Sequence, residues 1–148
     1  MDITKNLKFK LVRFNSAEQK QTVVLRDEIL RKPLGLVFTS AQLAVEKDDF
    51  HVAGYYEDRL AACAVLHPCE DKKLKMRQVA VYESFQRRGI GQELIKETER
   101  VAIENGFNLM FCHARKTAVP FYQKLGYKIV GDEFEEIGLA HFKMEKKL

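Results

Sequence analysis

Several sequence signals are scarce in this chain of 148 residues, and each scarcity excludes a class of protein. Its three cysteines, Cys63, Cys69 and Cys112, form no C-x-x-C pair, which argues against a disulfide framework and a zinc knuckle and suits a reducing cytoplasm. The N-terminal residues lack the apolar run of a signal peptide, and no stretch approaches the roughly 18 apolar residues of a membrane span. We therefore expect a cytoplasmic protein that does not associate with membranes.

A concentrated basic stripe is also missing. Lys and Arg number 25 against 21 Asp and Glu, a formal net charge of +4, and basic residues are interleaved with acids in segments such as 70–73 and 97–100. Nucleic-acid-binding proteins more often collect basic residues on one face, so we expect no nucleic-acid partner. A mild positive excess still favours the approach of a polyanionic small molecule. The four histidines lack the spacing of metal ligands, so no metal site is expected.

The length suits one domain, and the hydrophobic pattern changes from strand-like to helical in the second half of the chain. The segments that read as strands are 8–14, 50–56, 60–66, 75–82, 107–113, 128–134 and 139–145. Helices are expected from residue 16 to about 33, at 90–104 and at 117–125. The order is an antiparallel strand block, a strand–helix–strand crossover, another helix and a final hairpin, so residues 1–148 are expected to form a single α/β domain.

Two of these helices have a face that the sequence identifies. In the helix at 90–104, the residues on one arc are Ile90, Leu94, Ile95, Thr98, Val101 and Ala102. The first helix begins with Ser16 and Gln19 in the spacing of a capping box. Its candidate packing side carries Val24, Leu25, Glu28 and Ile29.

The sharpest feature is the segment 86–91, Gln-Arg-Arg-Gly-Ile-Gly, between a strand and an amphipathic helix. The first turn of a helix leaves backbone N–H groups free and carries partial positive charge. Glycines let a phosphate approach this backbone closely, and Arg87 and Arg88 add attraction. The segment therefore predicts a pyrophosphate site, with a tight turn that uses glycine for geometry alone as the alternative. It is not a Rossmann fingerprint, because Leu94 occupies the third glycine position, and no P-loop pattern occurs.

These residues resemble a known family. Gln78–Val81 followed by Gln86–Gly91 resembles motif A of the GNAT (Gcn5-related N-acetyltransferase) superfamily, Q/R-x-x-G-x-G/A, and Ala118–Tyr127 resembles its motif B, A-x-x-F-Y-x-K-x-G-F. The resemblance covers the chain from about Phe50 to the C-terminus, whereas the first 50 residues match only in element order. It implies a GNAT-like α/β fold: a mixed, mostly antiparallel central sheet flanked by helices and splayed between the fourth and fifth strands.

The resemblance also implies an activity and a coenzyme site. The expected reaction is direct transfer of an acetyl group from acetyl-CoA to a primary amine. The backbone of segment 86–91 would hold the pyrophosphate, and the backbone of Val79 and Val81 the pantetheine arm. Arg115 stands where the family often has an asparagine, and Phe121 belongs to motif B. The coenzyme-binding residues implied in this way are Val79, Val81, Gln86, Arg87, Arg88, Gly89, Ile90, Gly91, Arg115 and Phe121.

Acetyl transfer needs a group that removes a proton from the amine and benefits from one that protonates the departing thiolate. The resemblance makes Tyr122 the acid, since a phenol and a thiol have similar ordinary pKa values. His113 and His141 are candidate bases because imidazole titrates near neutral pH, although either can equally be structural. Glu135 and Glu136 would attract a cationic acceptor or simply form a charged turn. Cys112 as an acyl carrier is disfavoured because it alternates away from His113 along a strand.

Three questions stay open at this point. A non-catalytic acyl-CoA-binding sensor or partner module is the alternative to an enzyme, and a general nucleotide-phosphate binder is a third hypothesis. The acceptor is a small-molecule or peptide amine, with Arg26, Arg31 and the turn at 32–35 as candidates for its side of the site. If the protein oligomerises, the expected form is a homodimer through the C-terminal strands.

Overall fold

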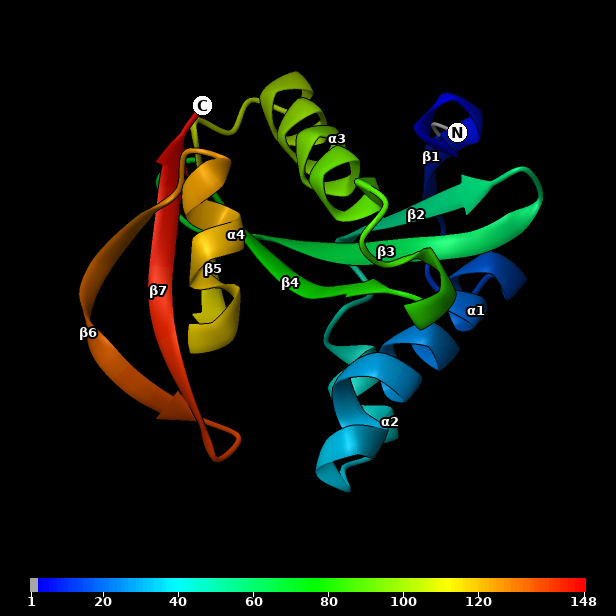
Figure 1. The fold of residues 1–148 in the computed structure, drawn as a ribbon, viewed down its shortest axis with the longest axis horizontal. Coiled ribbons are helices and arrows are strands. Elements are labelled where there is room, and N and C mark those ends of the chain that lie inside the picture. Colours follow the sequence, from blue (N-terminus) through cyan, green and yellow to red (C-terminus); the bar gives the residue numbers. More distant parts are fainter. Residues whose placement is uncertain (1–2) are drawn as a thin grey trace.

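The computed structural model describes residues 3–148 and contains a seven-stranded sheet (Figure 1). Its strands are β1 (Leu7–Val12), β2 (Phe50–Tyr56), β3 (Arg59–Pro68), β4 (Lys73–Val81), β5 (Leu109–Arg115), β6 (Lys128–Glu136) and β7 (Leu139–Lys147). They are arranged in the order β1-β2-β3-β4-β5-β7-β6. Only β4 and β5 pair in parallel, and all other neighbours are antiparallel. The expected mixed, mostly antiparallel sheet is confirmed.

Helices cover both faces of this sheet (Figure 1). They are α1 (Ala17–Arg26), α2 (Ser40–Ala44), α3 (Ile90–Glu104) and α4 (Val119–Lys124). The chain stays helical after α1 through a π-helix, Asp27–Arg31, and a 3-10 helix, Lys32–Leu34, and ends at Gly35 with a φ of +69°. Within residues 3–148, no helix combines the length and apolar character needed to cross a membrane.

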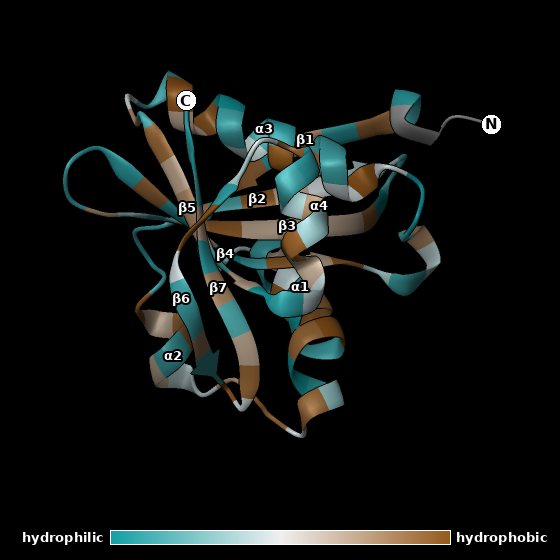
Figure 2. Cartoon of the chain, turned by 60° about the vertical axis from the view of Figure 1, so that its left-hand side comes forward, coloured by the Kyte–Doolittle hydropathy of each residue, from teal (hydrophilic) through white to brown (hydrophobic). Residues whose placement is uncertain are grey.

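Two apolar clusters pack the helices on the two faces of the sheet. The larger one joins α3 and α4 to the sheet and includes Leu66, Leu94, Met110, Tyr122 and Met144. All six residues expected on the inner arc of α3 are buried, which confirms that face. The smaller cluster, Leu25, Cys63 and Ala80, joins α1 to the other face. Figure 2 shows apolar colour along the central strands β2 and β3, where both faces are covered.

The start of the first helix is right and its predicted face is partly right, because Leu25 and Ile29 pack as expected while Val24 and Glu28 are exposed. The hydroxyl of Ser16 accepts a hydrogen bond from the backbone N–H of Gln19 at 3.1 Å, while the Gln19 side chain accepts from Asn15 N rather than from Ser16 N. The buried positions of the helix are Gln19, Thr22, Leu25 and Arg26, whereas Val24 is 63% exposed. A buried ion pair, which no periodicity of apolar residues reveals, turns the helix to this side.

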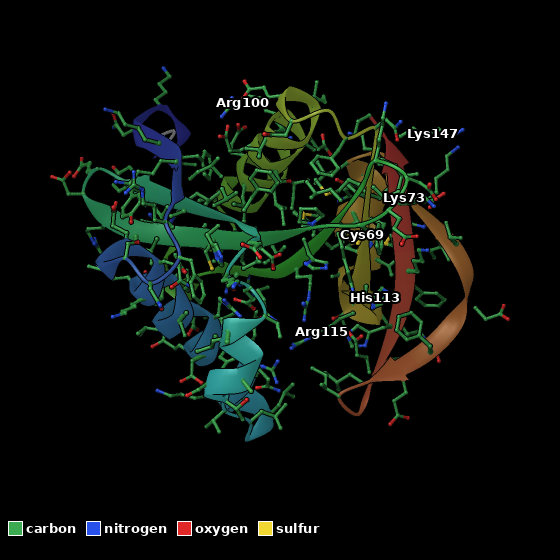
Figure 3. The ribbon with its side chains drawn as sticks, turned by 180° about the vertical axis from the view of Figure 1, so that it is seen from behind. Cys69, Lys73, Arg100, His113, Arg115 and Lys147 are labelled. Atoms are coloured by element: carbon green, nitrogen blue, oxygen red, sulfur yellow. The ribbon has the colours of Figure 1, made fainter. Side chains whose placement is uncertain are left out.

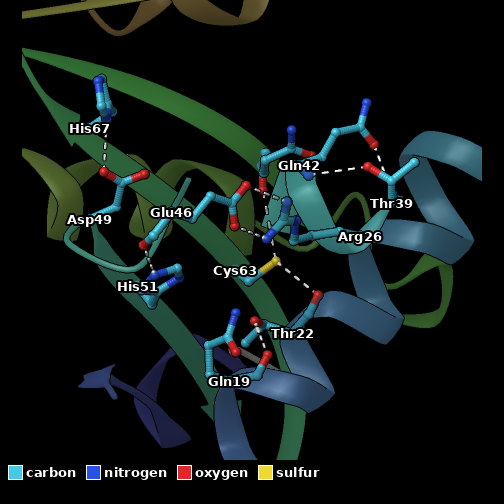
Figure 4. Close-up of polar contacts among 11 residues, drawn as sticks. Gln19, Thr22, Arg26, Thr39, Gln42, Glu46, Asp49, His51, Cys63 and His67 are labelled. Carbon is cyan, nitrogen blue, oxygen red and sulfur yellow. Dashed lines mark hydrogen bonds and ion pairs between the residues drawn. The ribbon is translucent and has the colours of Figure 1, made fainter. Parts of the chain in front are cut away.

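That ion pair joins Arg26 to Glu46 through two hydrogen bonds of 2.8 Å each (Figure 4). Arg26 is fully buried, and its guanidinium also stacks on Phe38 at 4.6 Å. A bidentate pair gives a buried arginine its counter-charge and avoids the cost of an unpaired charge, although Nε of Arg26 has no hydrogen-bond partner among residues 3–148. Arg26 therefore holds α1 to the segment before β2 and does not line an acceptor site, which corrects the expectation from the sequence.

The sheet opens between β4 and β5. These strands pair only from Lys73 opposite Leu109 to Met76 opposite Cys112. Beyond that point β4 bends at a bulge: its pairing with β3 shifts register, and Gln78 has a φ of +54°. A bulge increases local twist and bends the strand that carries it. The predicted splay is thus confirmed, and its position is set by the bulge.

Candidate active site

A cavity of about 430 Å³ lies at this opening. Residues of β4, β5, α4, the π-helix and the β6–β7 hairpin line it. Five of the residues expected to act in coenzyme binding or catalysis meet there: Val79, His113, Arg115, Tyr122 and His141. The remaining expected residues, Val81, Phe121 and segment 86–91, lie outside the cavity lining, around the end of β4 and the start of α3. The cleft therefore has two ends.

The edge of β4 connects the two ends. From Arg77 to Val81 this strand has no partner strand on the β5 side, so the backbone groups that point to that side, apart from any contact of the Val81 carbonyl with Gln86, are available to an extended chain. The bulge also changes which residues face α3. Before it, Leu74 and Met76 pack in the larger cluster, and after it Val79 and Val81 do. The two valines share a face, as expected, with their side chains in the core and their backbone at the open edge.

The loop after β4 ends in a helix N-terminus built on unusual backbone angles. Gly89 is the N-cap of α3 with a φ of +82°, and Arg87 has a φ of +63°. The Gln86 side chain donates a hydrogen bond to the Val81 carbonyl at 2.9 Å, which ties the loop to the end of the strand. A positive φ suits glycine, and the first N–H groups of α3 have no intrahelical acceptor. The segment therefore presents backbone donors as a phosphate site requires.

Phe121 and Arg115 lie at opposite ends of the cleft. Phe121 is 37% exposed and is therefore not part of the core. Its ring lies against Gly91, where a Cβ would come within 3.4 Å, so it flanks the phosphate segment. Arg115 crosses the cavity and donates a hydrogen bond to the Leu30 carbonyl at 3.4 Å (Figure 3). It therefore lies far along β5 from that segment, on the side of the π-helix.

Tyr122 is the buried acid candidate. Its side chain is 7% exposed and packs edge-to-face on Phe121 and Tyr127, with ring centroids at 5.1 and 5.6 Å. Burial raises the pKa of Tyr122, and the neighbouring Cys112 adds to the rise. The phenol thus stays protonated and able to donate. The Tyr122 side chain lines the cavity, so its O–H can donate to a ligand there.

The two histidines meet at one carboxylate, Glu136. His113 Nδ1 lies 3.1 Å from Glu136 Oε1, and His141 Nε2 lies 3.7 Å from Glu136 Oε2. Phe134 holds them in place, edge-on to His113 and stacked on His141. Burial raises the pKa of Glu136, but the hydrogen bond from His113 and the charges of His113, His141 and Lys75 outweigh it, so the pKa is lowered. This carboxylate is ionised and orients the imidazoles.

The histidines differ in their free nitrogens. His141 is 3% exposed, and its Nδ1 bonds to the Leu139 carbonyl at 2.9 Å while its Nε2 faces Glu136. His113 uses only Nδ1 for Glu136, which leaves Nε2 for a substrate. Figure 3 shows His113 beside β7, on the same strand as Arg115. The geometry therefore suits His113 to proton transfer and His141 to support.

Cys112 also reaches the cavity although it alternates with His113. Because the sheet is splayed there, the edge of β5 is open, and residues from both faces of this strand line the cavity. Burial raises the pKa of the Cys112 thiol to about 12, with only a partial opposing effect from Lys75. A thiol that stays protonated is a poor nucleophile, which agrees with the expectation against an acyl carrier. No three His, Cys, Asp or Glu side chains in residues 3–148 are arranged to hold a metal ion.

Comparison with known proteins identifies the family. Residues 34–148 match the family model described as the acetyltransferase (GNAT) domain. The chain belongs to the GNAT acetyltransferases. It is 26% identical over 133 residues to the uncharacterized N-acetyltransferase YjcF of Bacillus subtilis, covering 89% of this chain and 94% of the relative, and 27% identical over 136 residues to YitI of the same organism, covering 87% and 91%. The protein is thus an N-acetyltransferase.

Solved GNAT-like structures share the fold. Escherichia coli ElaA superposes with a TM-score of 0.80 at 20% identity, covering 95% of this chain and 99% of the other. A GNAT family acetyltransferase from Elizabethkingia anophelis with acetyl-CoA bound superposes with a TM-score of 0.75 at 17% identity, covering 97% and 99%. At these identities the likeness establishes the fold of this GNAT domain.

Three features of the GNAT site were missed or left undecided by the sequence. The positive φ of Gln78 gives no signal, because glutamine does not favour a bulge. The Gln86 side chain was expected to act through its backbone alone, yet it anchors the loop. From the sequence, Glu136 was expected either to attract a cationic acceptor or to be part of a charged turn. Its place beside both histidines depends on β7 lying between β5 and β6, which chain order does not reveal.

Proposed function

We propose that this GNAT member transfers the acetyl group of acetyl-CoA directly to a primary amine, with residues 1–148 acting as one acetyltransferase domain. The observation that carries the proposal is the unpaired edge of β4, which runs from the backbone donors at Gly89 to the cavity that holds Tyr122. The acetyl-CoA bound by the structural neighbour from Elizabethkingia anophelis supports the same choice of coenzyme.

The residues present fit this coenzyme. The backbone of segment 86–91 would hold the pyrophosphate, with Arg87 and Arg88 exposed beside it. The backbone of Val79 and Val81 would pair with the amides of the pantetheine arm in the manner of an added strand. Phe121 would border the phosphates through its contact with Gly91. When bound, acetyl-CoA supplies an acetyl group as a thioester at the cavity end.

The base and the acid approach the thioester from opposite faces of the sheet. Met110, Cys112 and Ala114 of β5 pack on the α3 side, so the alternating residues His113 and Arg115 face the α1 side. Tyr122 belongs to the α3 side. An amine that enters beside His113 therefore attacks one side of the carbonyl carbon, while the thiolate departs toward the phenol.

The step then balances as follows. The amine nitrogen forms a bond to the acetyl carbon and loses a proton to Nε2 of His113, whose Nδ1 is held by Glu136. The carbon–sulfur bond breaks, and Tyr122 donates a hydrogen bond and then a proton to the leaving thiolate. The proton on His113 is then lost to solvent, and a proton from solvent restores the Tyr122 phenol. Burial raises the pKa of Tyr122, so the phenol still carries its proton when the thiolate departs. The products are an N-acetyl amide and CoA.

The competing sensor hypothesis finds less support. A protein that only binds acyl-CoA has no use for a buried phenol or for an imidazole with an unoccupied nitrogen opposite it. Both are present at the same cavity. The cytoplasmic location and the homodimer through the C-terminal strands remain predictions. β6 is the edge strand on which that dimer would depend.

Calorimetric titration with acetyl-CoA, with ATP and NAD as controls, tests the coenzyme, and release of free CoA thiol in the presence of primary amines tests the transfer. We expect selective binding of acetyl-CoA and amine-dependent release of CoA. Absence of binding at millimolar acetyl-CoA would refute the proposal. Binding without release from any amine would favour the sensor instead.

A further inference from the structure

The acceptor half of the cavity carries an excess of positive charge. Four of its lining residues are cationic side chains: Arg31, Lys75, Arg77 and Arg115. Its one acidic lining residue, Glu136, is engaged by His113 and His141. All four cations are half-buried. This set, called the cation cluster below, comes from three elements: the π-helix, β4 and β5.

The cation cluster forms no close ion pair within the described part of the chain, although the charge of Glu136 acts on Lys75 from a longer distance. Ten other Lys, Arg and His residues of residues 3–148 form ion pairs within 4.0 Å, but none of these four does. Arg115 bonds only to the Leu30 carbonyl, and the Arg31 guanidinium stacks on Phe38 at 4.4 Å. Arg26, which lies on the same side of the sheet, has a dedicated partner in Glu46. The fold thus pairs one arginine of this region and leaves the cavity cations without a close ion pair.

The cations are also close enough to repel one another. Burial lowers the pKa of Lys75, and the charge of Arg77 lowers it further. Burial likewise lowers the pKa of Arg31, with Arg26 and Arg77 adding to the effect. Like charges in a partly desolvated site raise its free energy until a counter-charge arrives. A bound anion would remove this cost, and arginine forks suit carboxylate and phosphate oxygens.

The coenzyme does not supply this anion. Its phosphates belong to the backbone donors at Gly89, beyond the far end of β4, where Arg87 and Arg88 already stand. Leu74 and Met76 face α3, so Lys75 and Arg77 face the α1 side with His113. The cation cluster therefore surrounds the entry of the amine and not the path of the pyrophosphate.

We propose that the acceptor is a small primary amine that carries an acidic group, a carboxylate or a phosphate, bound by Arg31, Lys75, Arg77 and Arg115 while its amine lies at His113. This inference rests on the proposed transfer to an amine and names its substrate class. A cavity of about 430 Å³ suits a small molecule. Repulsion by the cation cluster excludes diamines and other cationic acceptors.

Three acceptors of one chain length test the charge requirement: 4-aminobutyrate, 4-aminobutanamide and 1,4-diaminobutane. We expect kcat/KM for the acid to exceed that for the amide by roughly tenfold, as one charge-assisted interaction provides, and the diamine to be the poorest. A fourth acceptor, 3-aminopropyl phosphate, distinguishes a site for phosphate from a site for carboxylate. Equal rates for acid and amide, or a preference for the diamine, would overturn the inference.

Variants locate the preference in the cation cluster. Arg77→Gln and Arg31→Gln should each raise KM for 4-aminobutyrate roughly tenfold and should raise KM for 4-aminobutanamide by a smaller factor. Arg77→Glu should transfer the preference to 1,4-diaminobutane. Lys128→Gln, an exposed change on β6, is the matched control and should leave all values unchanged. An acid preference that survives Arg31→Gln and Arg77→Gln together would show that these side chains do not bind the anion.

Binding measurements separate this inference from the proposed function. Calorimetry with acetyl-CoA alone decides whether the coenzyme site is real. Titration of the CoA-loaded protein with 4-aminobutyrate and 4-aminobutanamide then examines the anion site without requiring turnover. Tighter binding of the acid supports the inference even if no transfer occurs. Equal binding overturns it even if acetyl-CoA binds tightly.

Discussion

The two ends of the cleft are built by different means. The proposed coenzyme end consists of consecutive residues, 86–91, whose backbone donors are set by the left-handed angles of Arg87 and Gly89. The acceptor end consists of side chains from β4, β5, α4, the π-helix and the β6–β7 hairpin. A backbone site depends on conformation and tolerates changes of side chain. A side-chain site depends on the assembled fold and is sensitive to single functional groups.

The largest effect is expected from a change of backbone angle at the coenzyme end. Gly89→Val places a β-branched residue at a φ of +82°, which is strongly disfavoured and moves the first N–H groups of α3. Loss of two backbone donors, at about 1.4 kcal/mol each, weakens binding by roughly 100-fold. Calorimetric titration with acetyl-CoA measures this loss of affinity.

Arg88→Ala is the matched control, because it removes a charge from the same loop without altering the left-handed angle of Gly89. It should cost only a few-fold in affinity, since an exposed charge contributes little. If Arg88→Ala weakened acetyl-CoA as much as Gly89→Val, the contrast between a backbone site and a side-chain site would be lost.

This contrast also explains what the sequence could reveal. The turn at residues 86–91 and the helix after it were predictable because these residues are contiguous and the inner face of the helix, from Ile90 to Ala102, has a clear period. The sheet and its splay followed from strand order and the resemblance. The acceptor end was only partly predictable. His113, Arg115 and Tyr122 could be named, but their arrangement requires the β5–β7 register, which places Arg115 opposite His141.

Two further failures have physical causes. The face of α1 was partly misjudged because one buried residue is an arginine whose partner, Glu46, lies 20 positions away in a segment without a clear pattern. The bulge at Gln78 was invisible because tertiary pairing with β3 imposes the positive φ on a residue that does not favour it. Contacts distant in sequence override local propensity in both places.

The next effect examines a single functional group at the acceptor end. Tyr122→Phe keeps the packing on Tyr127 and removes only the proton donor, so kcat should fall roughly 100-fold, the lower bound for a general acid, with acetyl-CoA affinity nearly unchanged. Tyr127→Phe is the control: its hydroxyl donates to Glu99 at 2.8 Å, away from the cavity lining. It should lower stability by about 1 kcal/mol and leave kcat unchanged. A full rate in Tyr122→Phe would remove the phenol from the mechanism.

A smaller difference should separate the two histidines. His113→Gln removes the imidazole with a free Nε2, and kcat should fall by roughly 100-fold. His141→Gln removes a buried support of Glu136 and should cost roughly tenfold, mainly through lost positioning. Steady-state rates at saturating acetyl-CoA give both values. A larger loss of kcat in His141→Gln than in His113→Gln would exchange their roles.

The smallest effect is expected from replacing Cys112, whose thiol lines the cleft but is buried and protonated. Burial raises the pKa of the Cys112 thiol to about 12, so direct transfer should proceed in Cys112→Ala at a rate within about twofold of the wild type. Cys69, which is less buried, should be alkylated first at neutral pH, and Cys112 should react only as the pH approaches its pKa. Mass spectrometry after timed alkylation gives this order. Acetylation of Cys112 after incubation with acetyl-CoA would contradict direct attack by the amine. The transfer would then take two steps, with the buried Cys112 thiol as the acyl carrier.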